Sequence, residues 1–437
     1  MKKRIAFISE HASPLTMPGE TDNGGQNVYV AELAKEMAQR GYEVDVFTRR
    51  DREDLPEVIA WLPGIRVVYI QAGDNCPMPK EILLPYMEEF FTNMLAFMQR
   101  EKSTYALIHA NFWMSAMVAS WLKDLLGIPF IVTFHALGYI RKLYQKEMDK
   151  FPPERVEIER QAIENADRII AECPQDREDL IRFYAAPPEK ISIVPCGFNP
   201  WEFYPVDKEV ARRLLGLPAQ KKIILQLGRL VPRKGIDNVI RAVARLKRSG
   251  LSLLLVIVGG SSCENEAPCE EQQRLQRIAE EEQVSDLVLF AGGKCRDMLK
   301  FYYSAADLFI TTPWYEPFGI TPLEAMACGT PVIGSNVGGI KYSVLDSVTG
   351  SLVPPRDPEQ LSLKIRKLIR RPLLVSRMKK AAIRRVNDHF TWHQVADVMA
   401  GIYEQIMVPL PGPINEKLFV IHTREQEENN YSATIEL

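Results

Sequence analysis

The chain has 437 residues, which is too long for one compact core and fits two domains. Its composition, 46% hydrophobic and 25% charged, is typical of a globular protein, and no apolar run approaches the ~20 residues that span a bilayer. The formal net charge of −2 gives no overall attraction to nucleic acid or anionic lipid. We therefore expect no nucleic acid as a partner and no transmembrane segment, while homo-oligomer formation stays open.

The N-terminal half begins with an apolar run, Ile5–Ile8, preceded by basic residues. The run stops at Ser9 and is too short for a secretion signal, so we expect a first strand and a cytoplasmic protein. Short β-branched runs then alternate with longer segments of helical spacing, such as Val28–Arg40, which Gly41 is suited to end. The later strands expected in this half are Val44–Phe47, Val67–Ile70, Leu107–His109, Phe130–Phe134 and Ile169–Ala171.

Turn residues from Val194 to Pro200 interrupt this alternation and mark a hinge. A second alternation predicts strands at Ile223–Leu227, Leu253–Val258, Leu287–Phe290, Leu308–Thr311 and Pro331–Ile333. Strands that alternate with helices predict parallel sheets covered on both faces, so the fold class is α/β. We expect two Rossmann-like, doubly wound domains over residues 1–200 and 201–390, a last helix over 391–407, and a flexible tail over 408–437.

The seven cysteines are scattered along the chain. The closest pair, Cys263 and Cys269, has five intervening residues, which matches no common zinc spacing. We therefore expect reduced thiols and no metal site.

A basic loop follows the strand that ends at Leu227, whereas no P-loop or GxGxxG signature follows any strand. The loop runs from Gly228 to Gly235 and carries Arg229 and Lys234, at the strand end where ligands bind in open α/β sheets. A planar guanidinium and a compact ammonium both suit the oxygens of a diphosphate. Taken alone, the loop is better explained as a solvated basic turn.

Two glutamates with seven residues between them, Glu316 and Glu324, follow the strand Leu308–Thr311. The intervening prolines and glycine suit a loop that leads into a helix over Leu323–Cys328. Glu316 is expected in the loop and Glu324 near the helix N-terminus, where a helix-start acid is the alternative interpretation. Carboxylates accept hydrogen bonds from hydroxyl groups, so the pair can hold a sugar and a ribose.

Two further loops lie where ligands bind in such sheets. In the segment Asp22–Asn27, Gly24 and Gly25 precede a helix, so a ligand can approach the backbone and the helix N–H groups. His135 follows the strand Phe130–Phe134 and is a candidate site residue, and His109 has a weaker claim. The histidines expected to be structural or on the surface are His11, His389, His393 and His422.

Together these motifs resemble the GT-B-fold retaining glycosyltransferases of family 4, in the branch of sucrose-phosphate synthase and the inositol-phosphate N-acetylglucosaminyltransferase of mycothiol synthesis. The resemblance runs over residues 4–405 in matching order and spacing, and it implies a metal-independent hexosyltransferase with two domains facing a cleft. In this family the last helix crosses back to the first domain, which is expected here for Val395, Val398 and Ile402. The segments that carry the resemblance are His11–Leu15, Asp22–Val30, Phe134–Gly138, Gly228–Gly235 and Glu316 with Glu324.

The resemblance also implies roles on the donor side. Arg229 and Lys234 would hold the diphosphate and stabilise it as it leaves. Glu316 would bind the donor sugar and Glu324 the ribose, while His135 would face the sugar near its anomeric carbon. The expected donor is a UDP-sugar such as UDP-glucose, and no cofactor is expected. Further donor contacts are implied for Gly24, Gly25, Gly228, Gly293, Phe318, Gly319, Ile320 and Thr321.

On the acceptor side, the positions that match the family are Gln26, Lys80, Phe112, Arg141 and Arg155. Three cations packed together would repel one another without an anion, which favours a phosphorylated sugar or polyol. Separate solvated surface charges are the alternative. Phe112 and Ala136 replace hydroxyl-bearing residues of the relatives, so the identity of the acceptor stays open.

Other functions fit the same fold. A nucleotide-sugar 2-epimerase would convert the donor without an acceptor, and a glycogen-type phosphorylase would need a pyridoxal lysine and a longer chain. A non-catalytic nucleotide-sugar-binding protein would not need the full set of cations and glutamates.

Overall fold

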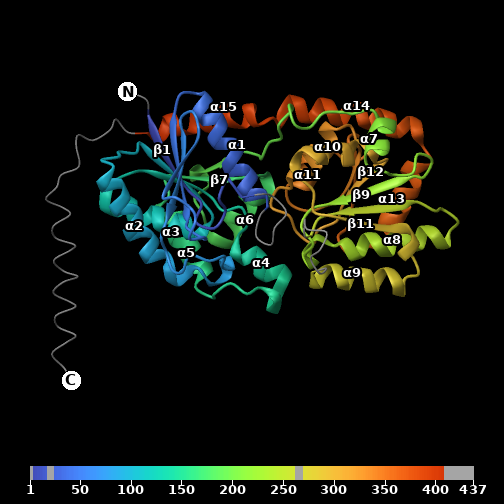
Figure 1. Ribbon diagram of the computed structural model, residues 1–437, viewed down its shortest axis with the longest axis horizontal. Helices are drawn as coiled ribbons and strands as arrows, with labels where there is room; N and C mark the ends of the chain where they lie inside the picture. The colour runs from blue at the N-terminus through green and yellow to red at the C-terminus, as the bar shows by residue number, and fades with distance from the viewer. Residues whose placement is uncertain (1–2, 17–23, 261–268, 408–437) are drawn as a thin grey trace, which may run out of the picture.

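The computed structural model describes residues 3–16, 24–260 and 269–407, which form two α/β halves lying side by side (Figure 1). All neighbouring strands of the first sheet run parallel except β3 (Val58–Leu62) and β4 (Ile65–Ile70), which are antiparallel. Its strand order is β3 (Val58–Leu62), β4 (Ile65–Ile70), β2 (Glu43–Arg49), β1 (Arg4–Ile8), β5 (Leu107–Asn111), β6 (Phe130–Thr133), β7 (Arg168–Ala171) and β8 (Ile191–Ile193).

Helices cover both faces of this sheet because successive side chains of a strand point to opposite faces. Ile5 and Phe7 of β1 belong to the core on one side, and Ala6 and Ile8 belong to the core on the other. The helices of this half are α1 (Gly25–Gln39), α2 (Met87–Arg100), α3 (Trp113–Leu126), α4 (Gly138–Gln145), α5 (Arg155–Asn165) and α6 (Pro174–Tyr184). Short 3₁₀ helices are η1 (Lys80–Ile82), η2 (Leu84–Tyr86), η3 (Lys146–Met148) and η4 (Pro188–Lys190).

The second sheet is parallel throughout the described strands. Its order is β11 (Val288–Gly292), β10 (Leu254–Val258), β9 (Ile223–Leu227), β12 (Leu308–Thr311), β13 (Val332–Ser335) and β14 (Gly350–Val353). The remaining helices are α7 (Lys208–Leu214), η5 (Pro232–Lys234), α8 (Ile236–Arg248), α9 (Glu270–Glu281), η6 (Ser285–Leu287), α10 (Arg296–Ala305), α11 (Ile320–Ala327), α12 (Ile340–Ser343), α13 (Pro358–Ile369), α14 (Pro372–His389) and α15 (Trp392–Ile406).

The α/β class and the parallel sheets expected from the sequence are confirmed. Every expected strand is present with its ends within two residues of the expected position. The strands that the sequence reading missed, β3, β8 and β14, all lie at sheet edges. β8 and β14 contain serine or glycine and lack the continuous apolar run that marks a buried parallel strand. β3 is a continuous apolar run, Val58–Leu62, that the sequence reading did not select.

The chain crosses between the halves twice, and the two crossings lie side by side. Phe198 N–H donates to the Phe390 carbonyl at 2.8 Å, and Trp392 N–H donates to the Phe198 carbonyl at 3.1 Å. A Cβ on Gly197 would lie 2.7 Å from the Trp392 nitrogen, so only glycine fits there. The two crossings therefore form one paired hinge.

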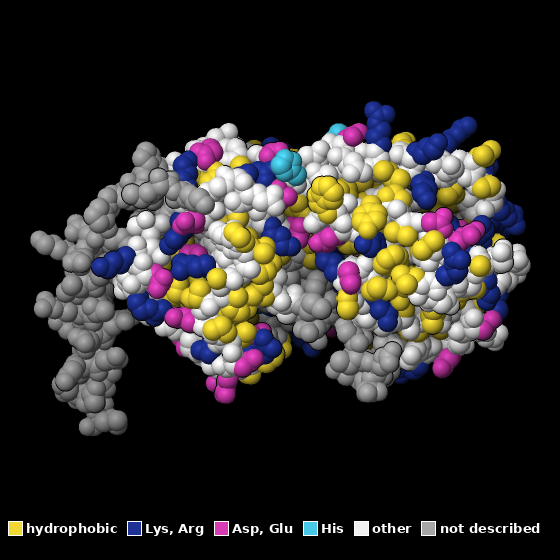
Figure 2. Space-filling view, turned by 45° about the horizontal axis from the view of Figure 1, so that its top comes forward, with side chains coloured by type: hydrophobic (Ala, Val, Ile, Leu, Met, Phe, Trp, Pro, Cys, Tyr) yellow, Lys and Arg dark blue, Asp and Glu magenta, His cyan; other side chains and the backbone are white. Residues whose placement is uncertain are grey.

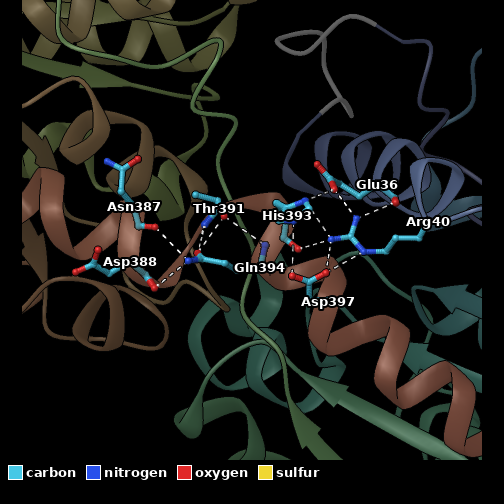
Figure 3. Close-up of polar contacts among 8 residues, drawn as sticks. All are labelled: Glu36, Arg40, Asn387, Asp388, Thr391, His393, Gln394 and Asp397. Carbon is cyan, nitrogen blue, oxygen red and sulfur yellow. Dashed lines mark hydrogen bonds and ion pairs between the residues drawn. The ribbon is translucent and has the colours of Figure 1, made fainter.

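Beyond the hinge, α15 lies along α1 of the first half (Figure 1). Figure 3 shows the polar contacts of this junction, where Arg40 lies 2.5 Å from Asp397 and His393 lies 3.3 Å from Glu36. Val395 and Ile402 of α15 are buried, but Val398 is 52% exposed and does not belong to the packed face expected for it.

Acidic and basic side chains lie among one another over most of the face in Figure 2, in line with the small net charge. Among the described residues, no helix is both long and apolar enough to cross a membrane.

Candidate active site

A cavity lies between the two halves, lined by residues that follow β1, β5, β6 and β7 on one side and β9 to β12 on the other. These strand ends are where open α/β sheets bind ligands. The residues expected from the sequence that line it are Gly24, Gly25, Gln26, Lys80, Phe112, His135, Arg141, Gly228, Arg229, Lys234, Gly293, Glu316, Phe318, Gly319, Ile320, Thr321 and Glu324. Arg155 does not line it.

The basic loop after β9 places several cations around one carboxylate. Lys234 Nζ lies 2.5 Å from Glu316 Oε2, and Arg233 lies 3.4 Å from the same oxygen. Burial lowers the pKa of Lys234 to about 8 against the opposing effect of Glu316, and the Arg233 and Arg229 charges add to the lowering. Burial disfavours the charge on Glu316, yet the cations outweigh it and hold its pKa below the ordinary value. Positive charge is in excess here, so the loop is suited to a further anion.

Two glycines at the start of α1 bring the first half close to this loop. A Cβ on Gly24 would lie 3.3 Å from Arg229 Nε, and one on Gly25 would lie 3.9 Å from Ile320 Cδ1. The backbone N–H groups at the start of α1 therefore reach the side of the cavity that the second half forms.

The helix that carries Glu324 begins earlier than expected. α11 starts at Ile320, behind Gly319 with φ +93°, so Glu324 lies in its second turn and not at its N-terminus. Its buried carboxylate lies 3.1 Å from Arg296 Nη1 and accepts a 2.8 Å hydrogen bond from the Tyr303 hydroxyl. Burial raises the pKa of Glu324, and Arg296 partly offsets the rise. The carboxylate is thus fixed in the cavity wall.

The Glu316 loop is supported by a pair of glycines. A Cβ on Gly338, which has φ +44°, would lie 1.8 Å from the Glu316 carbonyl oxygen, and one on Gly339 would lie 2.4 Å from Phe318 Cα. Glycine is therefore required at both positions for the loop to take this path.

His135 is held at both ring nitrogens. Nδ1 lies 3.1 Å from Glu172 Oε1, and Nε2 lies 3.1 Å from Asn111 Oδ1. Its backbone is left-handed, with φ +57°, which is uncommon outside glycine and frequent at functional sites.

His109, the weaker of the two histidine candidates for the site, is a core residue. Its ring lies 2.6 Å from the Tyr403 hydroxyl of α15 and 2.9 Å from Thr133 Oγ1. Burial and the neighbouring His135 lower the pKa of His109 to about 3, so it is neutral and ties the last helix to the first half.

Each cation expected in the acceptor pocket has a carboxylate partner from its own stretch of chain. The pairs are Lys80–Glu81 at 3.8 Å, Arg141–Asp149 at 3.2 Å and Arg155–Glu159 at 2.8 Å. The expectation that these cations must repel one another unless an anion is bound is therefore wrong, because each charge is already compensated.

Arg155 supports the pocket wall from behind. It is 2% exposed, donates a hydrogen bond to the Ala136 carbonyl and lies over the rings of Phe112 at 5.0 Å and Phe151 at 4.4 Å. Phe112 lines the cavity with a φ of +91°, a strained value for an aromatic residue. Arg155 thus positions Phe112 and the backbone after His135.

The sequence reading missed several residues that line the cavity, among them His11 and Glu172. His11, expected as structural or surface, lies 2.7 Å from Glu10 Oε1 and packs 4.7 Å from the Phe112 ring. Glu172, which holds His135, was not considered. Both follow strand ends closely, which is the one sequence signal that pointed to them.

Contacts across the cleft join the two halves at α4. The Gln145 amide donates to the Tyr315 hydroxyl, and the Tyr144 ring stacks on the Tyr315 ring at 5.3 Å. The loop that carries Glu316 is therefore in contact with the helix that carries Arg141.

Within the described ranges, no group of three or more His, Cys, Asp or Glu side chains could hold a metal ion. Cys269 is an exposed free thiol. The expectations for Asp22, Asn23, Cys263, His422 and residues 408–437 lie outside the described residues.

Comparison with known proteins identifies the family. The profile of Glycosyltransferase Family 4 matches residues 23–202, and that of Glycosyl transferases group 1 matches residues 207–385. The D-inositol 3-phosphate glycosyltransferase of Thermobispora bispora is 35% identical over 92% of this chain and 95% of that protein. This chain belongs to the family 4 glycosyltransferases.

Solved structures place this glycosyltransferase in the GT-B fold. The sucrose-phosphate synthase of Thermosynechococcus elongatus superposes with a TM-score of 0.86 at 35% identity, over 93% of this chain and 99% of that one. Anabaena HepE in complex with UDP has a TM-score of 0.72 at 19% identity, over 93% and 100% of the two chains. The GT-B fold expected from the sequence motifs is confirmed.

Proposed function

We propose that this glycosyltransferase acts in the cytoplasm and transfers a sugar from a UDP-sugar, such as UDP-glucose, to a small phosphorylated sugar or polyol. The transfer retains the configuration of the anomeric carbon and needs no metal ion. Arg229 and Lys234 bind the diphosphate, Glu324 binds the ribose, and Glu316 binds the donor sugar beside His135.

The observation that carries the proposal is the excess of positive charge around Glu316. Lys234 is held at 2.5 Å from this carboxylate, with Arg233 beside it, in a buried loop at a strand end. When a glycosyl–phosphate bond breaks, negative charge grows on the departing diphosphate. Fixed cations aimed at that position stabilise the transition state more than the ground state, which is the task usually given to a metal ion.

The choice of a UDP-sugar draws support from the neighbours in the comparison. The solved HepE structures contain UDP, UDP with glucose, and UDP-glucose. The Arg296–Glu324 pair offers this chain a carboxylate in a fixed place for ribose hydroxyl groups.

The choice of a phosphorylated acceptor rests on two features. The curated relatives are named for an inositol phosphate. In this chain, Lys80 and Arg141 line the acceptor side of the cavity, and Arg155 Nη1 is buried beneath it without a hydrogen-bond partner in the described structure. The charged groups of Lys80 and Arg141 suit a phosphate, while Arg155 acts from behind the pocket wall. Phe112 and Ala136 offer the phosphate no hydroxyl group.

The test is a screen of UDP-, GDP- and ADP-sugars in which released nucleotide is measured with matched phosphorylated and unphosphorylated acceptors, with and without EDTA. We expect release from a UDP-sugar, stimulated by the phosphorylated acceptor and insensitive to EDTA, and a product of retained configuration by NMR. A preference for the neutral acceptor would contradict the acceptor class. Conversion of the nucleotide sugar without any acceptor would identify an epimerase, and binding without turnover would identify a binding protein.

A further inference from the structure

The hydrogen bonds around His135 determine how many protons its ring carries. Nε2 faces Asn111 Oδ1 at 3.1 Å. The amide of Asn111 is oriented by its Nδ2 group, which donates to the His109 carbonyl at 3.2 Å, so that oxygen points to His135. Nδ1 faces Glu172 Oε1 at 3.1 Å. Both ring nitrogens of His135 therefore face hydrogen-bond acceptors.

The surroundings of Glu172 favour its role as an acceptor. The Cys196 thiol donates to the same carboxylate oxygen at 3.2 Å. Asp176, the second acid here, accepts the Glu172 backbone N–H at 3.0 Å. Burial raises the pKa of Asp176 to about 8, and the charge on Glu172 adds to the rise. At neutral pH Asp176 therefore holds a proton.

Among the described residues, the other two titratable side chains beside His135, Tyr29 and His109, carry no charge. The ring of Tyr29 from α1 meets it edge-on at 4.8 Å, and burial raises the pKa of that tyrosine well above its ordinary value. His109 from β5 is neutral because burial lowers its pKa to about 3. Glu172 is thus the charged partner of His135 on the elements packed around it.

We propose that Glu172 and Asn111 hold His135 as an imidazolium, which makes Glu172 a positioning residue of the transfer site. A ring that donates from both nitrogens has no lone pair, so His135 cannot accept the proton of the acceptor hydroxyl. The bond from the anomeric carbon to the diphosphate breaks while the acceptor oxygen bonds to that carbon. The proton of the acceptor hydroxyl group then passes to an oxygen of the departing diphosphate. This role rests on the proposed transferase function, whereas the protonation of the ring does not.

The protonation is tested by NMR on protein labelled with ¹⁵N-histidine, without substrates. The His135 signals are identified by their loss in His135→Asn, because asparagine tolerates a left-handed backbone. We expect a proton on both ring nitrogens at neutral pH. A neutral ring with one proton would overturn the proposal, whatever the donor screen shows.

The positioning role is tested by comparing Glu172→Gln with Asp176→Asn. Loss of a hydrogen bond to a charged group predicts that kcat falls about tenfold in Glu172→Gln. The donor KM should change little, and the alkaline fall in kcat should begin at lower pH because the ring loses its proton more readily. Asp176→Asn replaces an acid that already holds its proton, so its profile should match the wild type at neutral pH. Equal losses in both variants with an unshifted pH profile would show a structural role and overturn the positioning role.

Discussion

The two sides of the cleft, which we propose to bind the donor and the acceptor, hold their cations in different ways. On the donor side, Lys234 and Arg233 share one carboxylate, Glu316, which is 82 residues away from Lys234 in the chain. On the acceptor side, each arginine has a carboxylate of its own nearby in the sequence. Arg155 pairs with Glu159 on the same helix, and Arg141 pairs with Asp149, eight residues further along the chain. Two cations that share one acid leave an excess of positive charge for a ligand, whereas a cation with a carboxylate of its own offers hydrogen-bond donors but no net charge.

The largest effect is expected for a substitution on the acceptor side, and it is an effect on the stability of the protein. Arg155→Ala should lower the free energy of unfolding by about 3–5 kcal/mol, because Glu159 would keep a buried charge without its partner. Urea unfolding measures the loss. The double variant Arg155→Met with Glu159→Gln removes both charges and should recover most of the stability. A stable Arg155→Ala protein with only a raised acceptor KM would show that Arg155 binds substrate directly.

The next effect concerns turnover on the donor side. Lys234→Ala should lower kcat on the order of 10²-fold, because one strong electrostatic contact to the leaving group is lost. Stability should change much less, since the buried Glu316 keeps Arg233 as a partner. Lys300→Ala, which removes a surface lysine bound to the Tyr204 hydroxyl, is the matched control. Unchanged turnover in folded Lys234→Ala would remove the diphosphate assignment.

A smaller effect is expected for the locally paired cation that reaches the cavity. Arg141→Ala should raise the KM for a phosphorylated acceptor about tenfold, the cost of one hydrogen bond to a charged group. Hydrolysis of the donor without acceptor should be unchanged, because Arg141 lies on the other side of the cleft. Steady-state kinetics with both substrates separates the two parameters. If Asp149 fully neutralises Arg141, the acceptor KM will not change, and the acceptor is then recognised by other groups.

The excess charge on the donor side also predicts a pH dependence. Burial lowers the pKa of Lys234 to about 8 in the free protein, so Lys234 loses its charge as the pH rises through that value. A diphosphate binds the charged form, so UDP affinity should be full at pH 7 and fall by up to about tenfold one pH unit above the pKa. Calorimetry from pH 7 to 9 measures the change. In Lys234→Gln, the affinity for UDP should no longer fall over this pH range. An equal fall in both proteins would mean that a group other than Lys234 causes the pH dependence.

The sequence was enough to predict most of the strands and the loops of the second half that line the cavity, because both depend on local signals. Buried parallel strands are continuous apolar runs. Arg229 and Lys234 follow β9, and Glu316 and Glu324 follow β12, although Glu324 lies within α11 and not in the loop before it. The acceptor side was harder because its chemistry depends on side-chain pairing. Arg155 has the residue type of a phosphate ligand, but the Glu159 carboxylate one helical turn away holds it below the cavity. Glu172 was missed because nothing in its neighbourhood in sequence shows that His135 lies beside it.

A half-buried cation at the junction of α1 and α15, Arg40, tests whether a distant acid partner is enough to make a residue functional. Arg40 pairs with Glu36 on its own helix and with Asp397, 357 residues away, so it combines both patterns of the cleft (Figure 3). Asp397 is 59% exposed, and water screens an ion pair of this kind. Arg40→Ala should therefore lower the free energy of unfolding by less than about 1 kcal/mol and leave kcat unchanged. A large fall in kcat would mean that the position of α15 controls the cleft, and that distance along the chain outweighs burial in deciding which cations matter.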